Sequence, residues 1–290
     1  MTASRLRLRY TKLGKVRFLG HRDLARCLER ALRRAEVPVA RSGGFTPRAK
    51  VAFGLALPTG AESTAELLDL DLVEGSVVDL DRLPDDLSAA LPPGVDVVAV
   101  ASPPPGDGSL QQTVTSSEWE VALPGADPLE LSAGVERALA ASTLQHRVAR
   151  KGVQVDADLR PALLSLAVLL PVHDGPVVNG PVVNGCARLH LELASAAGTG
   201  GRTVRPSEVV SALWPHLGAG RVRRVAQWID RDGERREPLP LPPTTALALH
   251  ALWRAPLSRS PHVGTDHTIG AGRGHPPGLC PSEPARAVGA

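Results

Sequence analysis

Residues 21–37, HRDLARCLERALRRAEV, decide the fold of the first part of this chain. Apolar side chains recur there with the i, i+3, i+4, i+7 spacing of one helix face. The residues on this face are Leu24, Cys27, Leu28, Ala31, Leu32 and Ala35. Because Pro38 cannot continue a helix, the pattern predicts one amphipathic helix that ends there and packs on a core.

Strand patterns flank this helix on both sides. Residues 5–11 alternate Arg with Leu and Tyr, which predicts a half-buried strand with a basic outer face. After the helix, the patterns predict two strands, a short helix and a last strand, at residues 51–57, 67–73, 83–91 and 95–101. The order strand, helix, strand, strand, helix, strand is that of a ferredoxin-like unit.

The second part of the chain repeats this order less clearly. The predicted strands are residues 118–123, 145–150, 163–170, 188–193 and 222–229, and the predicted helices are residues 127–141 and 206–214. This is one strand more than the pattern requires, and the sequence leaves open which one is peripheral. We predict an α+β fold of two tandem ferredoxin-like (βαββαβ) domains. The domains are residues 1–101 and 113–237, with a linker at 102–112 and a disordered Pro/Gly-rich tail at 238–290.

The composition excludes several classes of protein. No stretch approaches the ~18 apolar residues of a membrane span, and no apolar signal region is visible, so we expect a cytoplasmic protein with no membrane partner. Cys27, Cys186 and Cys280 lie too far apart for a metal motif, and no nucleotide-binding motif occurs, so we expect no metal and no cofactor. A tandem PVVNG duplication at residues 176–185 indicates a surface loop.

The charge is distributed unevenly, although the net charge is only +3. Residues 1–50 hold 14 Lys and Arg against 3 Asp and Glu, a net charge of +11. Residues 51–110 hold 1 against 11, a net charge of −10. Such asymmetry indicates either a segment that faces a polyanion or two segments that neutralise each other.

Arginines step by four along the predicted helix, at Arg22, Arg26, Arg30 and Arg34, with Arg33 beside them. Guanidinium groups in such a ribbon can pair bidentately with phosphates. The alternative is a solvated face that Asp23 and Glu29 partly neutralise. The arginines outnumber these acids, and we therefore treat them as candidate anion-binding residues.

The loop after the helix adds a second set of candidates. Its residues with cationic, flexible or aromatic character are Arg41, Gly43, Gly44, Phe45, Arg48 and Lys50. Paired glycines let backbone N–H groups approach an anion, and an aromatic ring in a loop can stack on a base. The alternative is an ordinary turn with Phe45 inside the core. A weak catalytic candidate, His21, stands at the start of the helix as a possible general base.

Three motifs near the N-terminus carry a family resemblance: LRYTKLG at 8–14, RFLGHRDL at 17–24 and LERALRRA at 28–35. The match continues in SGGFTP at 42–47, FGLALP at 53–58 and GAES at 60–63, and more weakly to about residue 230. The chain resembles the radical SAM-associated (radical SAM-linked) domain family of unknown function. It departs at Gly20, where that family usually has Ser.

The resemblance implies a radical SAM protein as partner. Together with the basic residues, it leads to the hypothesis of an accessory RNA-binding protein, with tRNA as one candidate ligand. We expect this protein not to be an enzyme. Two alternatives remain open. One is a metal-independent endoribonuclease that uses His21. The other is a protein-interaction module whose two charged segments neutralise each other.

Overall fold

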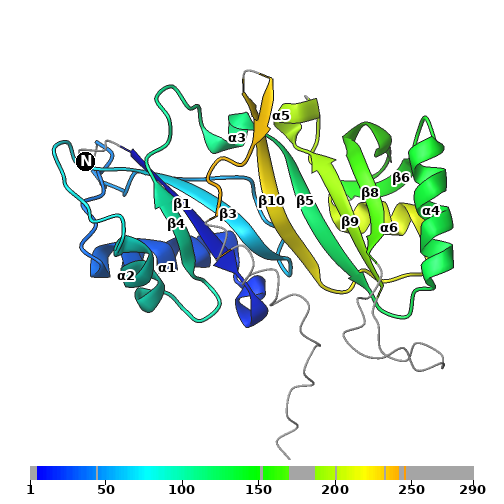
Figure 1. Cartoon of the computed structure of the whole chain (residues 1–290), viewed down its shortest axis with the longest axis horizontal. Coiled ribbons are helices and arrows are strands. Elements are labelled where there is room, and N and C mark those ends of the chain that lie inside the picture. The colour runs from blue at the N-terminus through cyan, green and yellow to red at the C-terminus, as the bar shows by residue number, and fades with distance from the viewer. Residues whose placement is uncertain are drawn as a thin grey trace, which may run out of the picture.

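The computed structural model describes residues 5–43, 45–150, 153–169, 187–199, 201–231, 233–241 and 245. One mixed sheet of nine strands extends across the molecule and includes strands from both halves of the chain (Figure 1). Helices pack against it, so the fold is α+β. Gly44, the PVVNG duplication and most of the predicted tail lie outside the described residues.

The first half builds one end of this sheet. Its strands are β1 (Arg5–Lys12), β2 (Val51–Phe53), β3 (Glu62–Asp71) and β4 (Val97–Ala101), and its helices are α1 (His21–Arg34) and α2 (Leu83–Ala90). The strands lie in the order β4-β1-β3-β2, and all neighbours are antiparallel. Leu6 and Leu8 of β1 pack on Leu24 and Leu28 of α1, as the helical spacing predicted.

The second half builds the other end. Its main strands are β5 (Val114–Leu123), β8 (Leu163–Leu169), β9 (Ala187–Ala194) and β10 (Val222–Arg231), and its longer helices are α4 (Pro128–Ala140) and α6 (Pro206–Leu213). The order β10-β5-β9-β8 is again antiparallel throughout. The strand in excess of the pattern is β6 (Gln145–Arg150), which pairs with β7 (Val153–Asp158) in a separate two-stranded sheet.

Short elements complete the fold. They are the 3-10 turns η1 (Gly14–Phe18) and η2 (Arg160–Ala162), the helices α3 (Leu110–Thr113) and α5 (Ala196–Thr199), and the strand β11 (Glu234–Arg236). The sequence patterns did not predict α3, α5, β7 or β11. The elements α3, α5 and β11 have three or four residues, too few to show a periodicity. In contrast, β7 alternates apolar and polar residues over six positions, a strand signal that we missed in the sequence.

The two halves meet where β10 runs parallel to β3. Arg223 pairs with Glu62 and Arg224 with Ser63. The same edge of β3 also holds β2, but β2 is short and covers only residues 68–70. The first residues of β3, which β2 does not cover, therefore pair with β10.

The predicted basic outer face of β1 is wrong. Arg7 is 1% exposed and Arg9 is 3% exposed. Arg7 donates to both carboxylate oxygens of Asp69, from Nε at 2.7 Å and from Nη2 at 3.0 Å. Arg9 donates from Nη1 to Glu237 at 2.8 Å and to the carbonyl oxygen of Leu239 at 3.1 Å. Chain segments distant in sequence cover this face, and strand alternation contains no information about them.

Candidate functional site

The end of α1 positions the candidate site. The helix stops at Arg34, three residues earlier than expected, because Glu36 adopts a left-handed backbone with φ 52°. Val37 then donates its N–H to the carbonyl of Leu32 at 3.0 Å. This turn sends the following residues back beside the helix.

Residues 40–43 and 45–50 form the two arms of a hairpin that we call the basic hairpin. The bridge between Arg41 and Ala49 closes it, and the N–H of Ser42 donates to the carbonyl of Arg48 at 2.8 Å. Its base is fixed on the end of β3, since the N–H of Ala40 donates to the carbonyl of Asp71 at 2.8 Å. The hairpin is thus anchored to the sheet.

An open groove of about 720 Å³ lies between α1 and the basic hairpin. Its cationic lining residues are Arg22, Arg26, Arg33, Arg41 and Arg48, its acidic one is Glu29, and its aliphatic ones include Ala25, Leu32, Val37, Val39 and Ala49. Arginines therefore reach the groove from two separate elements. We call this feature the arginine groove.

Most of these guanidinium groups have no acidic partner. Arg26 pairs with Asp23 at 3.2 Å, but both side chains are exposed, and such a pair is weak in water. The side chains of Arg22, Arg33 and Arg48 make no hydrogen bond or ion pair with any residue that the structure describes. The arginine groove thus presents an uncompensated positive charge to solvent.

The structure brings together only part of the predicted set. Arg22, Arg26, Arg41 and Arg48 line the arginine groove, whereas Arg30, Arg34 and Lys50 do not. Nη2 of Arg30 lies 3.3 Å from Sγ of Cys27. Arg34 lines a separate hollow beside Asp86, and Lys50 lines another beside Asp71. Arg33, which stands outside the four-residue step, is the lining residue that the ribbon omits.

Phe45 lies near the tip of the basic hairpin and is 109% exposed, so the alternative that it packs in the core is wrong. Gly43 is also exposed, its backbone is not left-handed, and a Cβ there would meet nothing within 4 Å. The conformation of the hairpin therefore does not require glycine at position 43.

His21 is the first residue of α1 and lines the same groove. Gly20 is the N-cap and supplies no side-chain hydrogen bond. The imidazole meets the edge of Phe53, with the ring centroids 4.8 Å apart. A general base is normally held in position by a hydrogen bond to a carboxylate. Among the described residues, no carboxylate makes this contact with His21.

Internal neutralisation applies to β1 and β3 but not to α1. Glu62 binds Arg223 at 2.9 Å, Glu66 binds Arg224 at 2.9 Å, and Asp69 binds Arg7 at 2.7 Å. The acids of β3 are thus paired with arginines of the sheet. Among the described residues, no ion pair joins Arg22, Arg26 or Arg30 of α1 to Glu62, Glu66 or Asp69.

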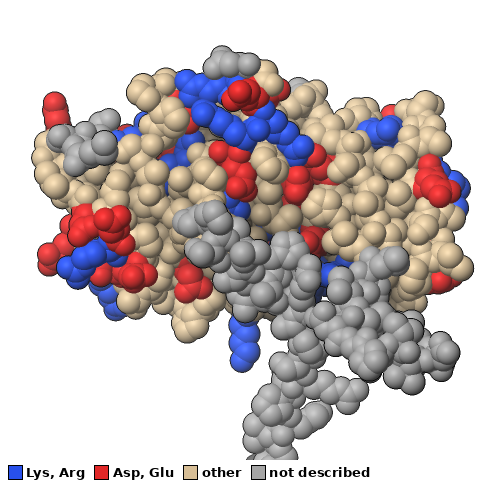
Figure 2. All heavy atoms as spheres, viewed as in Figure 1, with Lys and Arg blue, Asp and Glu red and all other residues tan. Residues whose placement is uncertain are grey.

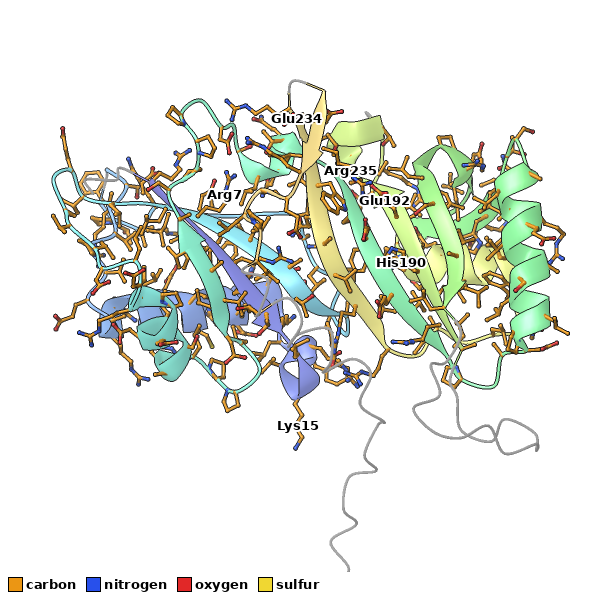
Figure 3. All side chains as sticks on the ribbon, viewed as in Figure 1. Arg7, Lys15, His190, Glu192, Glu234 and Arg235 are labelled. Carbon is orange, nitrogen blue, oxygen red and sulfur yellow. The ribbon has the colours of Figure 1, made fainter. Side chains whose placement is uncertain are left out.

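A second polar cluster lies on the sheet and was not predicted. His190 and Glu192 of β9 and Arg235 of β11 belong to it (Figure 3). Nη2 of Arg235 lies 2.9 Å from both Glu118 and Glu192, and Nε2 of His190 lies 3.4 Å from Glu118. The bond to Glu118 raises the pKa of His190, and the bond from His190 lowers the pKa of Glu118. The alternation of polar residues along β9 was the signal available in the sequence.

The charges of this cluster compensate one another. In Figure 2, Lys and Arg atoms interleave with Asp and Glu atoms over the hairpin of β10 and β11. The contrast with the arginine groove favours the groove as the binding surface. The described residues contain no group of His, Cys, Asp and Glu that could hold a metal ion. No helix in the described part of the chain is long and apolar enough to cross a membrane.

The fold and the groove define an α+β protein with a solvent-exposed surface that suits a polyanion. Residues 5–206 match the family described as "Uncharacterized protein conserved in bacteria (DUF2344)", and the chain belongs to this family. No curated protein matches the chain.

Proposed function

We propose that this protein is a non-catalytic, cytoplasmic accessory protein that binds RNA in the arginine groove and acts with a radical SAM enzyme. The resemblance of the N-terminal motifs supports the enzyme partner. We also propose that residues 1–101 and 113–237 are two ferredoxin-like units, since each half has the strand order fourth, first, third, second.

One observation carries the RNA-binding role. Arg22 and Arg33 of α1 face the same groove as Arg48 of the basic hairpin, and none of the three has a described acidic partner. A guanidinium presents donors in a fixed fork that matches a phosphate. Phosphate neutralisation dominates the affinity of proteins for nucleic acids, so a row of free arginines is the expected footprint.

Two matched double variants test this role. Arg26→Glu with Arg33→Glu reverses two charges in the groove, and Arg30→Glu with Arg34→Glu reverses two charges on the same helix outside it. We expect the first variant to bind a mixed-sequence single-stranded RNA at least about tenfold more weakly at low salt, a loss of about 1.4 kcal/mol. The control variant should stay close to the native affinity.

Fluorescence anisotropy across a salt series is the measurement. For the native protein, log K should fall with log salt with a slope of about −0.7 per phosphate contact. An equal loss in both variants would show a response to net charge rather than a groove, and no loss in either would refute the RNA-binding role.

A further inference from the structure

We infer that the arginine groove takes an unpaired RNA strand and that Phe45 stacks on one of its bases. This inference rests on the proposed RNA-binding role and adds the class of nucleic acid. Three features of the site carry it: the exposure of Phe45, the arginines on the same hairpin, and the aliphatic lining of the groove.

The ring of Phe45 is available on all sides. It is 109% exposed, so it makes no packing contact with the rest of the described chain. Phe18 is also exposed, at 62%, but the guanidinium of Arg17 lies 4.6 Å from the centre of its ring. Phe45 thus offers an uncovered aromatic face near the tip of an anchored hairpin.

The hairpin that carries Phe45 also carries two arginines of the groove. Arg41 and Arg48 stand on the two arms of the basic hairpin and both line the groove. A ligand that stacks a base on Phe45 can therefore place its phosphates near these two arginines. Aromatic rings combined with a basic path for the backbone are the usual platform for single strands.

The groove is not lined by charge alone. Between its arginines its lining includes half-buried aliphatic side chains, among them Ala25, Val37 and Val39. Such side chains suit the faces of bases and riboses better than they suit phosphates.

A duplex offers neither contact. In an A-form helix the bases are stacked and paired inside, and the protein meets phosphates and 2′-hydroxyl groups. An uncovered phenylalanine then has no base face to bind, and the aliphatic lining has no apolar partner. The combination found here therefore favours an unpaired segment, such as a loop or a free end.

The test compares two RNA probes and two variants of the full chain. The probes are a 20-nucleotide single strand of mixed sequence and the same strand annealed to its complement. We expect Phe45→Ala to weaken binding of the single strand by about tenfold and to leave its salt slope unchanged, because the phosphate contacts remain. Phe45→Trp should restore the affinity, since a larger ring also stacks.

Leu129→Ala is the matched control, because Leu129 is a 79% exposed apolar residue of α4 in the other half of the chain. Its affinity should equal the native value. If Phe45→Ala binds the single strand normally, or the duplex binds as tightly as the single strand, the inference is wrong. The RNA-binding role would still hold in that case if charge reversal in the groove weakens binding. If a poly-glutamate peptide displaces the strand at equal charge concentration, the groove takes an acidic protein segment and both proposals fall.

Discussion

At the scale of single residues, the pair formed by His190 and Glu118 gives the fold a pH dependence. Their hydrogen bond raises the pKa of His190, so the folded state holds the imidazole proton more tightly than the unfolded chain does. The resulting stabilisation is fully present below about pH 6.5 and is lost as the pH rises through the raised pKa. The acidic and basic groups that face this imidazole are Glu118, Glu120, Glu192, Arg188 and Arg235.

Urea unfolding between pH 5.5 and 8.5 measures this effect. We expect the free energy of unfolding to fall by about 1 kcal/mol across the range, the value of a partly exposed ion pair. His190→Gln should flatten the profile, and His216→Gln, which changes an exposed histidine beside Glu130, should change it less. A profile that keeps its full slope in His190→Gln would contradict the assignment.

The arginines of α1 show which part of the candidate site a sequence pattern can predict. A helix has about 3.6 residues per turn, so each step of four residues rotates the side chain by about 40°. From Arg22 to Arg34 the ribbon therefore turns by about 120°, and its second half leaves the groove. Arg33 lies almost above Arg22 by the same geometry. The sequence therefore placed Arg33 beside the ribbon. It could not show which arginines line the groove, because the position of the hairpin beside α1 depends on the left-handed turn at Glu36, for which the sequence carries no glycine signal.

At the scale of elements, Glu62 joins β3 to β10. It is 1% exposed and accepts hydrogen bonds from Arg221 at 2.6 Å and from Arg223 at 2.9 Å. The N–H of Gly14 donates to its other oxygen at 3.0 Å. Burial raises the pKa of Glu62, but the hydrogen bonds from Arg223 and Arg221 outweigh it and hold the pKa below its usual value. The carboxylate thus stays charged at the junction of the two halves.

Glu62→Ala should cost about 3 to 5 kcal/mol of stability, because it removes a buried carboxylate that accepts hydrogen bonds from both Arg221 and Arg223. Asp71→Ala is the matched control, since Asp71 lies at the other end of β3 and pairs with Arg5 of β1, but both of these side chains are partly exposed. The control should cost less than about 1 kcal/mol. Urea midpoints and m-values measure both changes. Equal losses would show that burial does not distinguish the two pairs.

The sequence predicted the helices and strands whose apolar residues recur regularly over several turns or positions. It did not predict the irregular segments that fold back over the sheet and cover the side chains of β1. Both α1 and α4 follow from their spacing, and β5, β9 and β10 follow from their alternation. The burial of Arg7 depends on Asp107, from a stretch whose Pro and Gly content indicated only a linker. Side chains from such segments complete the charge pairs of β1, and local sequence does not show where they fold back.

At the scale of the whole molecule, the sheet continues from one half into the other through β10 and β3. This junction has only two residue pairs in its backbone register. Side-chain contacts extend the junction further, since Arg224 donates hydrogen bonds to Glu66 and to the carbonyl groups of Leu55 and Ala56. The arginine groove lies in the first half of the chain. The arginines that pair with Glu62 and Glu66 of β3 come from the second half.

The first half should therefore not fold stably without the second. In a fragment of residues 1–112, Glu66 loses Arg224 and Arg9 loses Glu237. Glu62 loses Arg221 and Arg223 and keeps only the more distant Arg17, at 3.5 Å. Each buried charge left unpaired costs several kcal/mol, which is comparable to the whole stability of a small domain. We expect this fragment to lack a cooperative urea transition and to bind RNA weakly, and we expect addition of the fragment 113–290 to restore both. A fragment 1–112 that unfolds cooperatively and binds RNA like the full chain would show that β10 contributes little to the groove.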